Sequence, residues 1–228
     1  MMLQSIDRGK IYFYIALFTI LISIHNLNFI NLFDNFFKIK HIIINSDIDP
    51  AYNQQISNSL NKFNNKNIVS VRSSDLTTIL DSFNIIGEYK IKKEYPSIIK
   101  VNLKKTKILA YFFKNDVKFF IGENGKKIKD LHVLQKNLPL IVGNFEISEF
   151  FYLKDLISYN GFLLKDFKKI YSYKSNRWDL LYKENTLIKL PTTNLEYSIS
   201  LLSKIIKNKD LSKIKVIDLR ANNQIIFL

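Results

Sequence analysis

The residues that could carry covalent or metal chemistry are few in this sequence and lie far apart. The three histidines are His25, His41 and His132, and there is no cysteine. Thiolate catalysis, disulfides and cysteine-ligated metals are therefore excluded. No H-E-x-x-H, G-x-S-x-G, phosphate-binding loop or dinucleotide-binding glycine motif occurs. Only carboxylates brought together from distant segments would make an enzyme, so the sequence predicts no catalytic residue, no metal site and no cofactor.

The stretch that could do binding chemistry is KIKVIDLRANNQIIFL, at 213–228. In its second strand Ile225 and Phe227 share one face while Ile226 and Leu228 share the other, so both faces are apolar. An apolar edge strand is an aggregation hazard unless something covers it. A partner strand would cover it and would satisfy its open N–H and C=O groups. The alternative is an internal strand that the protein itself covers on both faces.

The candidate partner-binding residues are those of this turn and strand: Arg220, Ala221, Asn222, Gln224, Ile225, Ile226, Phe227 and Leu228. The pair Asn222-Asn223 suits the turn because asparagine tolerates the left-handed backbone conformation. Arg220 is expected to pair with an acidic residue of a partner, or else with Asp218 or a neighbouring strand. Whether the partner contacts one face of the strand or the other stays open at this point.

The charge of the chain invites a nucleic-acid interpretation, since 34 Lys and Arg residues against 20 Asp and Glu give a net charge of +14. Base readout and bidentate phosphate contacts favour arginine. The only arginines are Arg8, Arg72, Arg177 and Arg220. A solvated lysine-rich surface is therefore favoured, and a membrane-tethered nucleic-acid-binding protein is an alternative.

An apolar run at 11–33 follows Arg8 and Lys10 and contains no Asp, Glu, Lys or Arg. At about 1.5 Å per residue it is long enough to cross a hydrocarbon core of about 30 Å. The rival interpretation, a cleaved signal peptide, needs small residues after the run, and SIHNLNF offers none. The sequence predicts a cytoplasmic tail at 1–10 and a transmembrane helix at 11–33, with the basic residues favouring a cytoplasmic N-terminus.

The residues after this span predict a small α+β module. Apolar side chains recur first at helical spacing and then at every second position. Asp49 can cap the first helix, with Pro50 at its first position, and Ser73 or Ser74 can cap the second. The expected strand, helix, helix, strand and strand lie at 37–46, 50–63, 73–83, 89–95 and 98–103.

The second half of the chain predicts a mixed, β-rich domain with two helices. Asn115-Asp116 and Asn124-Gly125 favour hairpin turns. Two further turns are expected at Ser175-Asn176 and Glu184-Asn185, between three strands. The helices are expected at 147–158 and 194–208, and the last two strands at 213–220 and 224–228.

This order of elements, together with several short motifs, resembles the bacterial cell-division protein family FtsQ (DivIB) over almost the whole chain. K-K-E-Y-P at 92–96, leading into an alternating strand, resembles the family's POTRA domain. Later matches are G-E-N-G at 122–125, L-P with Gly143 at 138–143, N-R-W-D-L at 176–180 and I-D-L-R at 217–220. The chain departs from the family pattern at Lys105, Ile108, Thr186, Pro191 and Ala221, the last of which stands where an aromatic residue often follows I-D-L-R.

The resemblance implies a POTRA domain at 37–107 and a β-rich FtsQ-type domain at 108–228 that ends on a C-terminal edge strand. It implies a non-enzymatic division protein, held in the bacterial inner (cytoplasmic) membrane by one span, with its folded domains periplasmic at the septum. The implied partners are FtsB-like and FtsL-like coiled-coil membrane proteins, the former bound by the last strand. A POTRA-bearing component of a protein-translocation machine is an alternative, although neither tandem POTRA repeats nor a barrel is evident.

Overall fold

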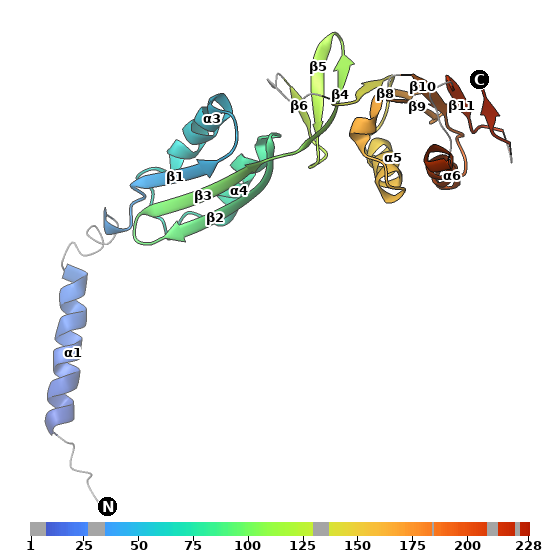
Figure 1. The fold of residues 1–228 in the computed structure, drawn as a ribbon. Coiled ribbons are helices and arrows are strands. Elements are labelled where there is room, and N and C mark those ends of the chain that lie inside the picture. The colour runs from blue at the N-terminus through green and yellow to red at the C-terminus, as the bar shows by residue number, and fades with distance from the viewer. Residues whose placement is uncertain (1–7, 27–34, 130–136, 184, 209–213, 222–223) are drawn as a thin grey trace, which may run out of the picture. The chain divides into compact units, whose positions relative to one another are not determined.

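A computed structural model describes the protein at residues 8–26, 35–129, 137–183, 185–208, 214–221 and 224–228. The chain divides into two compact units (Figure 1). We call them unit 1 (Met1–Phe83 and Glu88–Lys104) and unit 2 (Asn84–Gly87 and Lys105–Leu228). Each unit has its own sheet and its own helices.

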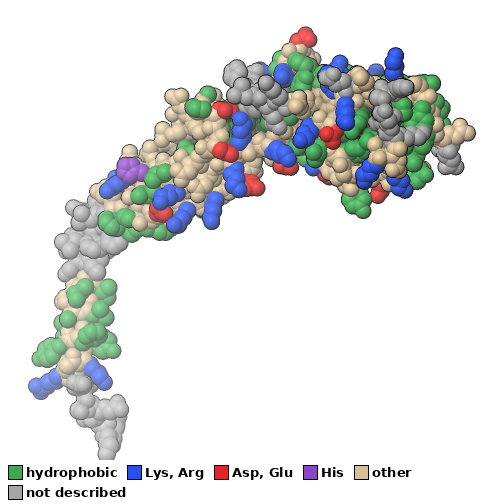
Figure 2. Space-filling model, viewed as in Figure 1, with side chains coloured by type: hydrophobic (Ala, Val, Ile, Leu, Met, Phe, Trp, Pro, Cys, Tyr) green, Lys and Arg blue, Asp and Glu red, His purple; other side chains and the backbone are tan. Residues whose placement is uncertain are grey.

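The first described element is helix α1 (Arg8–Asn26), which is 19 residues long. Figure 2 shows hydrophobic side chains along it, and those from Tyr12 to Ile22 are largely uncovered by the rest of the described chain. Within the described ranges, no helix combines the length and the apolar character that a membrane crossing requires. The span predicted at 11–33 is therefore not found as such, and its residues 27–33 lie outside the described part.

Unit 1 contains a three-stranded sheet in the order β1-β3-β2, with β1 parallel to β3. Its elements follow the predicted order of strand, helix, helix, strand and strand (Figure 1). On β3, Ile99, Val101 and Leu103 are buried, as the alternation predicted. The elements are β1 (His41–Ser46), α3 (Pro50–Leu60), η1 (Asn61–Phe63), α4 (Ser73–Ser82), β2 (Ile86–Glu94) and β3 (Ile98–Lys105).

The predicted cap of the second helix, Ser73 or Ser74, is wrong. Helix α4 already includes Ser73, and Arg72 occupies the N-cap position with an extended backbone. The Arg72 N–H donates to Oδ2 of Asp75 at 3.4 Å, so the side chain in the first turn partners a main-chain donor at the start of the helix. The first helix does begin as predicted, with Asp49 at the N-cap position and Pro50 in the first turn.

Unit 2 is built on a nine-stranded mixed sheet with the order β12-β11-β10-β9-β8-β7-β4-β5-β6. Helices α5 (Ile147–Tyr159) and α6 (Leu195–Asn208) pack on one face of it (Figure 1). The strands are β4 (Ile108–Lys114), β5 (Val117–Gly122), β6 (Lys127–Lys129), β7 (Leu140–Val142), β8 (Phe167–Ser172), β9 (Trp178–Tyr182), β10 (Thr186–Lys189), β11 (Val216–Asp218) and β12 (Ile226–Phe227).

One row of side chains across this sheet forms the centre of the unit 2 core. Strand pairing places these residues next to one another, and all of them are buried on the helix-covered face. Because the side chains of a strand alternate between faces, the rows on either side of it point the other way. The row consists of Ile217, Ile188, Leu180, Ile170, Ile141 and Phe112.

The turns of unit 2 follow from residues that tolerate positive φ. Asn115 and Asp116 have φ of 50° and 59° between β4 and β5, and Gly125 has φ of 74° between β5 and β6, so both predicted hairpins are confirmed. The last two strands are shorter than predicted, covering Val216–Asp218 and Ile226–Phe227. Glu184 lies outside the described part.

Candidate partner-binding edge

Strand β12 lies at one end of the nine-stranded sheet and, in the part of the chain that the structure describes, pairs only with β11. The Leu228 N–H donates to the Val216 carbonyl at 3.0 Å, and the Val216 N–H donates to the Leu228 carbonyl at 2.9 Å. The internal-strand alternative therefore does not hold for the described residues. An edge strand of this kind presents one row of main-chain groups away from the sheet.

The register of the hairpin decides which main-chain groups face that edge. Asp218 pairs with Ile226, and Ile217 pairs with Phe227. Inter-strand hydrogen bonds occur at every second residue of an antiparallel pair. Since Leu228 bonds to β11, Ile226 also turns its main chain toward β11, and Ile225 turns its N–H and C=O toward the open edge.

The side chains of the strand divide between the two faces of the sheet. Ile225 and Phe227 are half-buried and pack against the unit 2 core. Ile226 and Leu228 are 43% and 69% exposed on the opposite face. A partner strand beside β12 would therefore find its uncovered apolar contacts on the face that the helices leave open.

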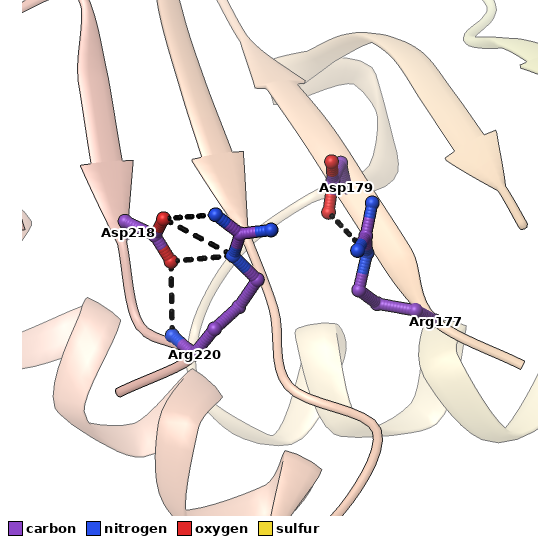
Figure 3. A network of polar contacts seen from close by, with 4 residues as sticks. All are labelled: Arg177, Asp179, Asp218 and Arg220. Atoms are coloured by element: carbon purple, nitrogen blue, oxygen red, sulfur yellow. Dashed lines mark hydrogen bonds and ion pairs between the residues drawn. The ribbon is translucent and has the colours of Figure 1, made fainter. Parts of the chain in front are cut away.

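Arg220 pairs with Asp218 at the start of the turn (Figure 3), which is one of the two alternatives expected for it. The Asp218 carboxylate accepts bonds from Nε of Arg220 at 2.8 Å and from Nη2 at 2.5 Å. It also accepts the Arg220 main-chain N–H at 3.0 Å. The side-chain bonds from Arg220 lower the pKa of Asp218, and the same bonds raise the pKa of Arg220.

A second pair, Arg177 and Asp179 on the same open face, was not singled out as a functional feature in the sequence. Nε of Arg177 lies 3.4 Å from Oδ1 of Asp179, whose side chain is only 2% exposed. The Arg177 guanidinium also lies over the Tyr173 ring, 4.1 Å from its centroid. The signal in the sequence was present in N-R-W-D-L, where a charged residue stands on each side of a buried tryptophan.

Strand register brings these two pairs into one row on the open face. Asp218 is the neighbour of Lys189 on β10, and Lys189 is the neighbour of Asp179 on β9. Figure 3 shows Arg220 lying between Asp218 and the Arg177–Asp179 pair. The result is an alternation of negative and positive groups that leads from the middle of the sheet to the candidate edge.

Two further candidate residues, Ala221 and Gln224, lie beside a groove next to β12. Ala221 is half-buried and Gln224 is exposed, and the Gln224 N–H approaches the Ala221 carbonyl at 3.4 Å. Asn222 lies outside the described residues. The groove has a volume of about 270 Å³, and among its lining residues are Ala221, Gln224, Ile225 and, from α6, Tyr197 and Leu201.

Within the described residues the structure assembles no metal site, because no three His, Asp or Glu side chains come together as ligands. His41 lies on β1, while His132 and the side chain of His25 are outside the described part. Chemically, the edge can therefore offer main-chain hydrogen bonds, apolar contacts and one oriented guanidinium. These are binding functions.

Two kinds of comparison with known proteins, with a family model and with individual relatives, indicate the same family. Residues 110–220 match the family model described as "Cell division protein FtsQ/DivIB, C-terminal". A protein of Rickettsia typhi named "Cell division protein FtsQ" is 25% identical over 193 residues, which are 82% of this chain and 71% of the relative. A protein of the same name from Rickettsia prowazekii matches to the same extent. The match to the family model runs from β4 through Arg220, so β12 lies just beyond it.

Proposed function

Because this chain belongs to the FtsQ/DivIB family of cell division proteins, we propose that it is a non-enzymatic assembly protein of the division machinery. Its partners in this proposal are FtsB-like and FtsL-like membrane-anchored coiled-coil proteins at the septum. An FtsB-like partner docks at the β12 edge and brings the FtsL-like protein with it. The observation that carries the proposal is an edge strand whose outward main chain and uncovered apolar side chains lie together.

Docking proceeds by addition of a partner strand to β12. The main chain of Ile225 faces the open edge, and Ile226 and Leu228 supply apolar surface beside it. Each added main-chain hydrogen bond contributes about 0.5–1.5 kcal/mol net. Burial of apolar surface contributes about 25 cal/mol per Å². The main chain therefore sets the direction of the partner strand, and the two exposed side chains supply much of the affinity.

Arg220 supplies the specificity in this proposal. Asp218 holds its Nε and Nη2 atoms, and no bond from Nη1 is found within the described residues. A guanidinium already oriented by one carboxylate loses little side-chain entropy when it meets another. An acidic residue of the partner would bind Nη1, so Arg220 favours partners that carry a carboxylate next to the added strand.

The experiment uses two proline substitutions in adjacent positions of β12. Ile225→Pro removes an N–H that faces the open edge, so partner binding should be lost while the melting temperature stays near that of Ile225→Ala. Ile226→Pro removes an N–H that faces β11, so binding and melting temperature should both fall. Binding of the purified protein to an immobilised FtsB-like partner from the same source, together with differential scanning fluorimetry, gives both readouts.

The matched control is Ile225→Ala, which loses the same half-buried side chain but keeps the N–H. The difference between Ile225→Pro and Ile225→Ala then isolates the main-chain hydrogen bond. Normal binding by Ile225→Pro would show that the partner docks elsewhere. Unfolding of Ile225→Pro would show that its N–H bonds within the protein and that the edge is closed.

Anchoring in the cytoplasmic membrane through residues 11–33 is part of the proposal, and it rests on the apolar run in the sequence and on the family. The N-terminus lies in the cytoplasm, and the parts of the two units that follow residue 33 lie outside it. Cysteines placed singly at Ser5 and Ser175 test this, because the chain has none of its own. A membrane-impermeant thiol reagent should label Ser175→Cys in cells with a permeabilised outer layer and spare Ser5→Cys; the reverse pattern would overturn the topology.

A further inference from the structure

Unit 1 has an open edge of its own at β1. Strand β1 lies at the end of the three-stranded sheet and pairs with β3. The Lys40 N–H donates to the Ser97 carbonyl at 2.8 Å, at the point where the ladder to β3 begins. The His41 N–H donates to the same carbonyl at 3.4 Å. Main-chain groups of a strand point alternately to its two sides, so Ile43 and Asn45 also face β3, whereas Ile42, Ile44 and Ser46 turn their main-chain groups toward the open edge.

A neighbouring segment limits this edge at its start. The Ile39 N–H donates to the Lys66 carbonyl at 2.9 Å, and the Ile68 N–H donates to the Phe37 carbonyl at 2.8 Å. The outer side of the chain is therefore covered as far as Ile39. From His41 onward no such bond is found in the described part of unit 1, which leaves about five residues open to a new strand.

The composition of β1 contrasts with that of the opposite edge. Strand β1 reads HIIINS, with no Lys, Glu, Pro or Gly, and Ile43 is 39% exposed. Strand β2, at the other end of the same sheet, reads IGEYKIKKE and places charged side chains at most of its positions. Charged residues protect an edge strand from unwanted pairing. One edge of this sheet is protected in that way and the other is not.

The charges that flank β1 indicate which kind of strand could pair with it. Lys38 and Lys40 precede the strand, and Asp47 and Asp49 follow it, so the edge is basic at one end and acidic at the other. We propose that β1 pairs antiparallel with β1 of a second copy of this chain, about a two-fold axis at Ile43. This pairing brings the basic end of each strand beside the acidic end of the other, so the edge is its own complement.

The geometry of such a dimer is defined residue by residue. With Ile43 opposite its own copy, His41 lies opposite Asn45, and Lys40 lies beside Asp47 of the other chain. The outward main-chain groups of Ile42 and Ile44 bond those of Ile44 and Ile42 in the other copy, which allows about four new hydrogen bonds. Ile43 and its copy form a non-hydrogen-bonded antiparallel pair, whose Cα separation of about 4.5 Å a disulfide can bridge.

The first experiment is disulfide cross-linking of the full chain, which contains no cysteine. Ile43→Cys should form a disulfide-linked dimer on mild oxidation, seen on a non-reducing gel. Lys92→Cys on the β2 edge is the matched control and should remain monomeric. Failure of Ile43→Cys to form more dimer than Lys92→Cys would overturn the proposal and leave this edge to another partner.

The second experiment tests the charge complementarity in the same Ile43→Cys background. Lys40→Asp places two acidic groups together at both ends of the pairing, and should lower the dimer yield about tenfold. Asp47→Lys should do the same with basic groups. The double variant Lys40→Asp and Asp47→Lys exchanges the charges at the two ends of β1 and should restore the dimer yield. Circular dichroism should be unchanged in all of these variants. If the yield is then not restored, the two-fold register is wrong.

Discussion

Both sheets of this protein carry ion pairs on an open face, and the pairs differ in how deeply their carboxylates are buried. In unit 1, Glu94 contacts Lys100 at 2.8 Å and Lys92 at 3.0 Å, and it lies on the exposed edge strand β2. In unit 2, Asp179 is almost fully buried on β9, which has five strands on one side of it in the sheet order and three on the other. The chemical groups are alike, but the two carboxylates differ in their exposure to water.

The comparison shows that the width of a sheet decides how much an ion pair matters. In a three-stranded sheet every charged side chain lies on or next to an edge strand. Water screens an ion pair there, so the pair contributes little to stability. In nine strands, neighbouring side chains displace water from the central strands. Removal of one partner there leaves a buried charge without compensation.

The largest effect is expected from Arg177→Leu. This change leaves the carboxylate of Asp179 buried without the guanidinium that lies beside it, and it also removes the contact with the Tyr173 ring. The free energy of unfolding should fall by about 3 kcal/mol, measured by urea denaturation followed by circular dichroism.

The double variant Arg177→Leu and Asp179→Leu sharpens this result. With both charges gone and the volume roughly kept, most of the lost stability should return. A loss below about 1 kcal/mol for Arg177→Leu alone would mean that the pair behaves as an exposed one, and the comparison between the two sheets would fail.

An intermediate effect is expected from Arg220→Gln, because Arg220 is partly exposed although its bonds to Asp218 are short. At pH 7 the loss should be about 1–2 kcal/mol. Arg220→Lys keeps the charge but loses the two-atom contact, so it should recover only part of this loss.

The same variant predicts a pH dependence. Arg220 lowers the pKa of Asp218 in the folded protein below its ordinary value of 3.8. The stabilisation is therefore fully present above the pKa of the unfolded chain and is lost as the pH falls through the lowered folded pKa. The difference in urea midpoint between the wild type and Arg220→Gln should be constant from pH 7 to pH 5 and should decrease as the pH falls below the ordinary value of 3.8. A difference that does not decrease in acid would assign it to packing of the arginine stem instead.

The smallest effect is expected from Glu94→Gln in unit 1. Hydrogen bonds from Lys100 and then Lys92 lower the pKa of Glu94, but the side chain is 28% exposed on an edge strand, where water screens the pair. We expect no measurable change in the urea midpoint at neutral pH, with or without added salt. A change as large as that of Arg220→Gln would show that the width of the sheet does not set the strength of these pairs.

Local patterns predicted most elements of the fold correctly. The turn at Asn115-Asp116 and the helix that starts at Pro50 depend on residues next to one another, so the sequence carries their signal directly. The features that the sequence did not indicate depend on contacts between distant segments. The burial of Asp179, and its place in a row with Lys189 and Asp218, follow from a parallel pairing of β10 and β11 across helix α6.

By itself, the sequence determined that Ile225 and Phe227 share one face of the last strand and that Ile226 and Leu228 share the other, because alternation is a property of any extended chain. Only the tertiary structure decided which pair meets the core. It also decided that β12 ends the sheet, since the order of strands depends on long-range pairing. The register with β11 then turned the main chain of Ile225 toward the open edge, and no pattern within nine residues could have specified that direction.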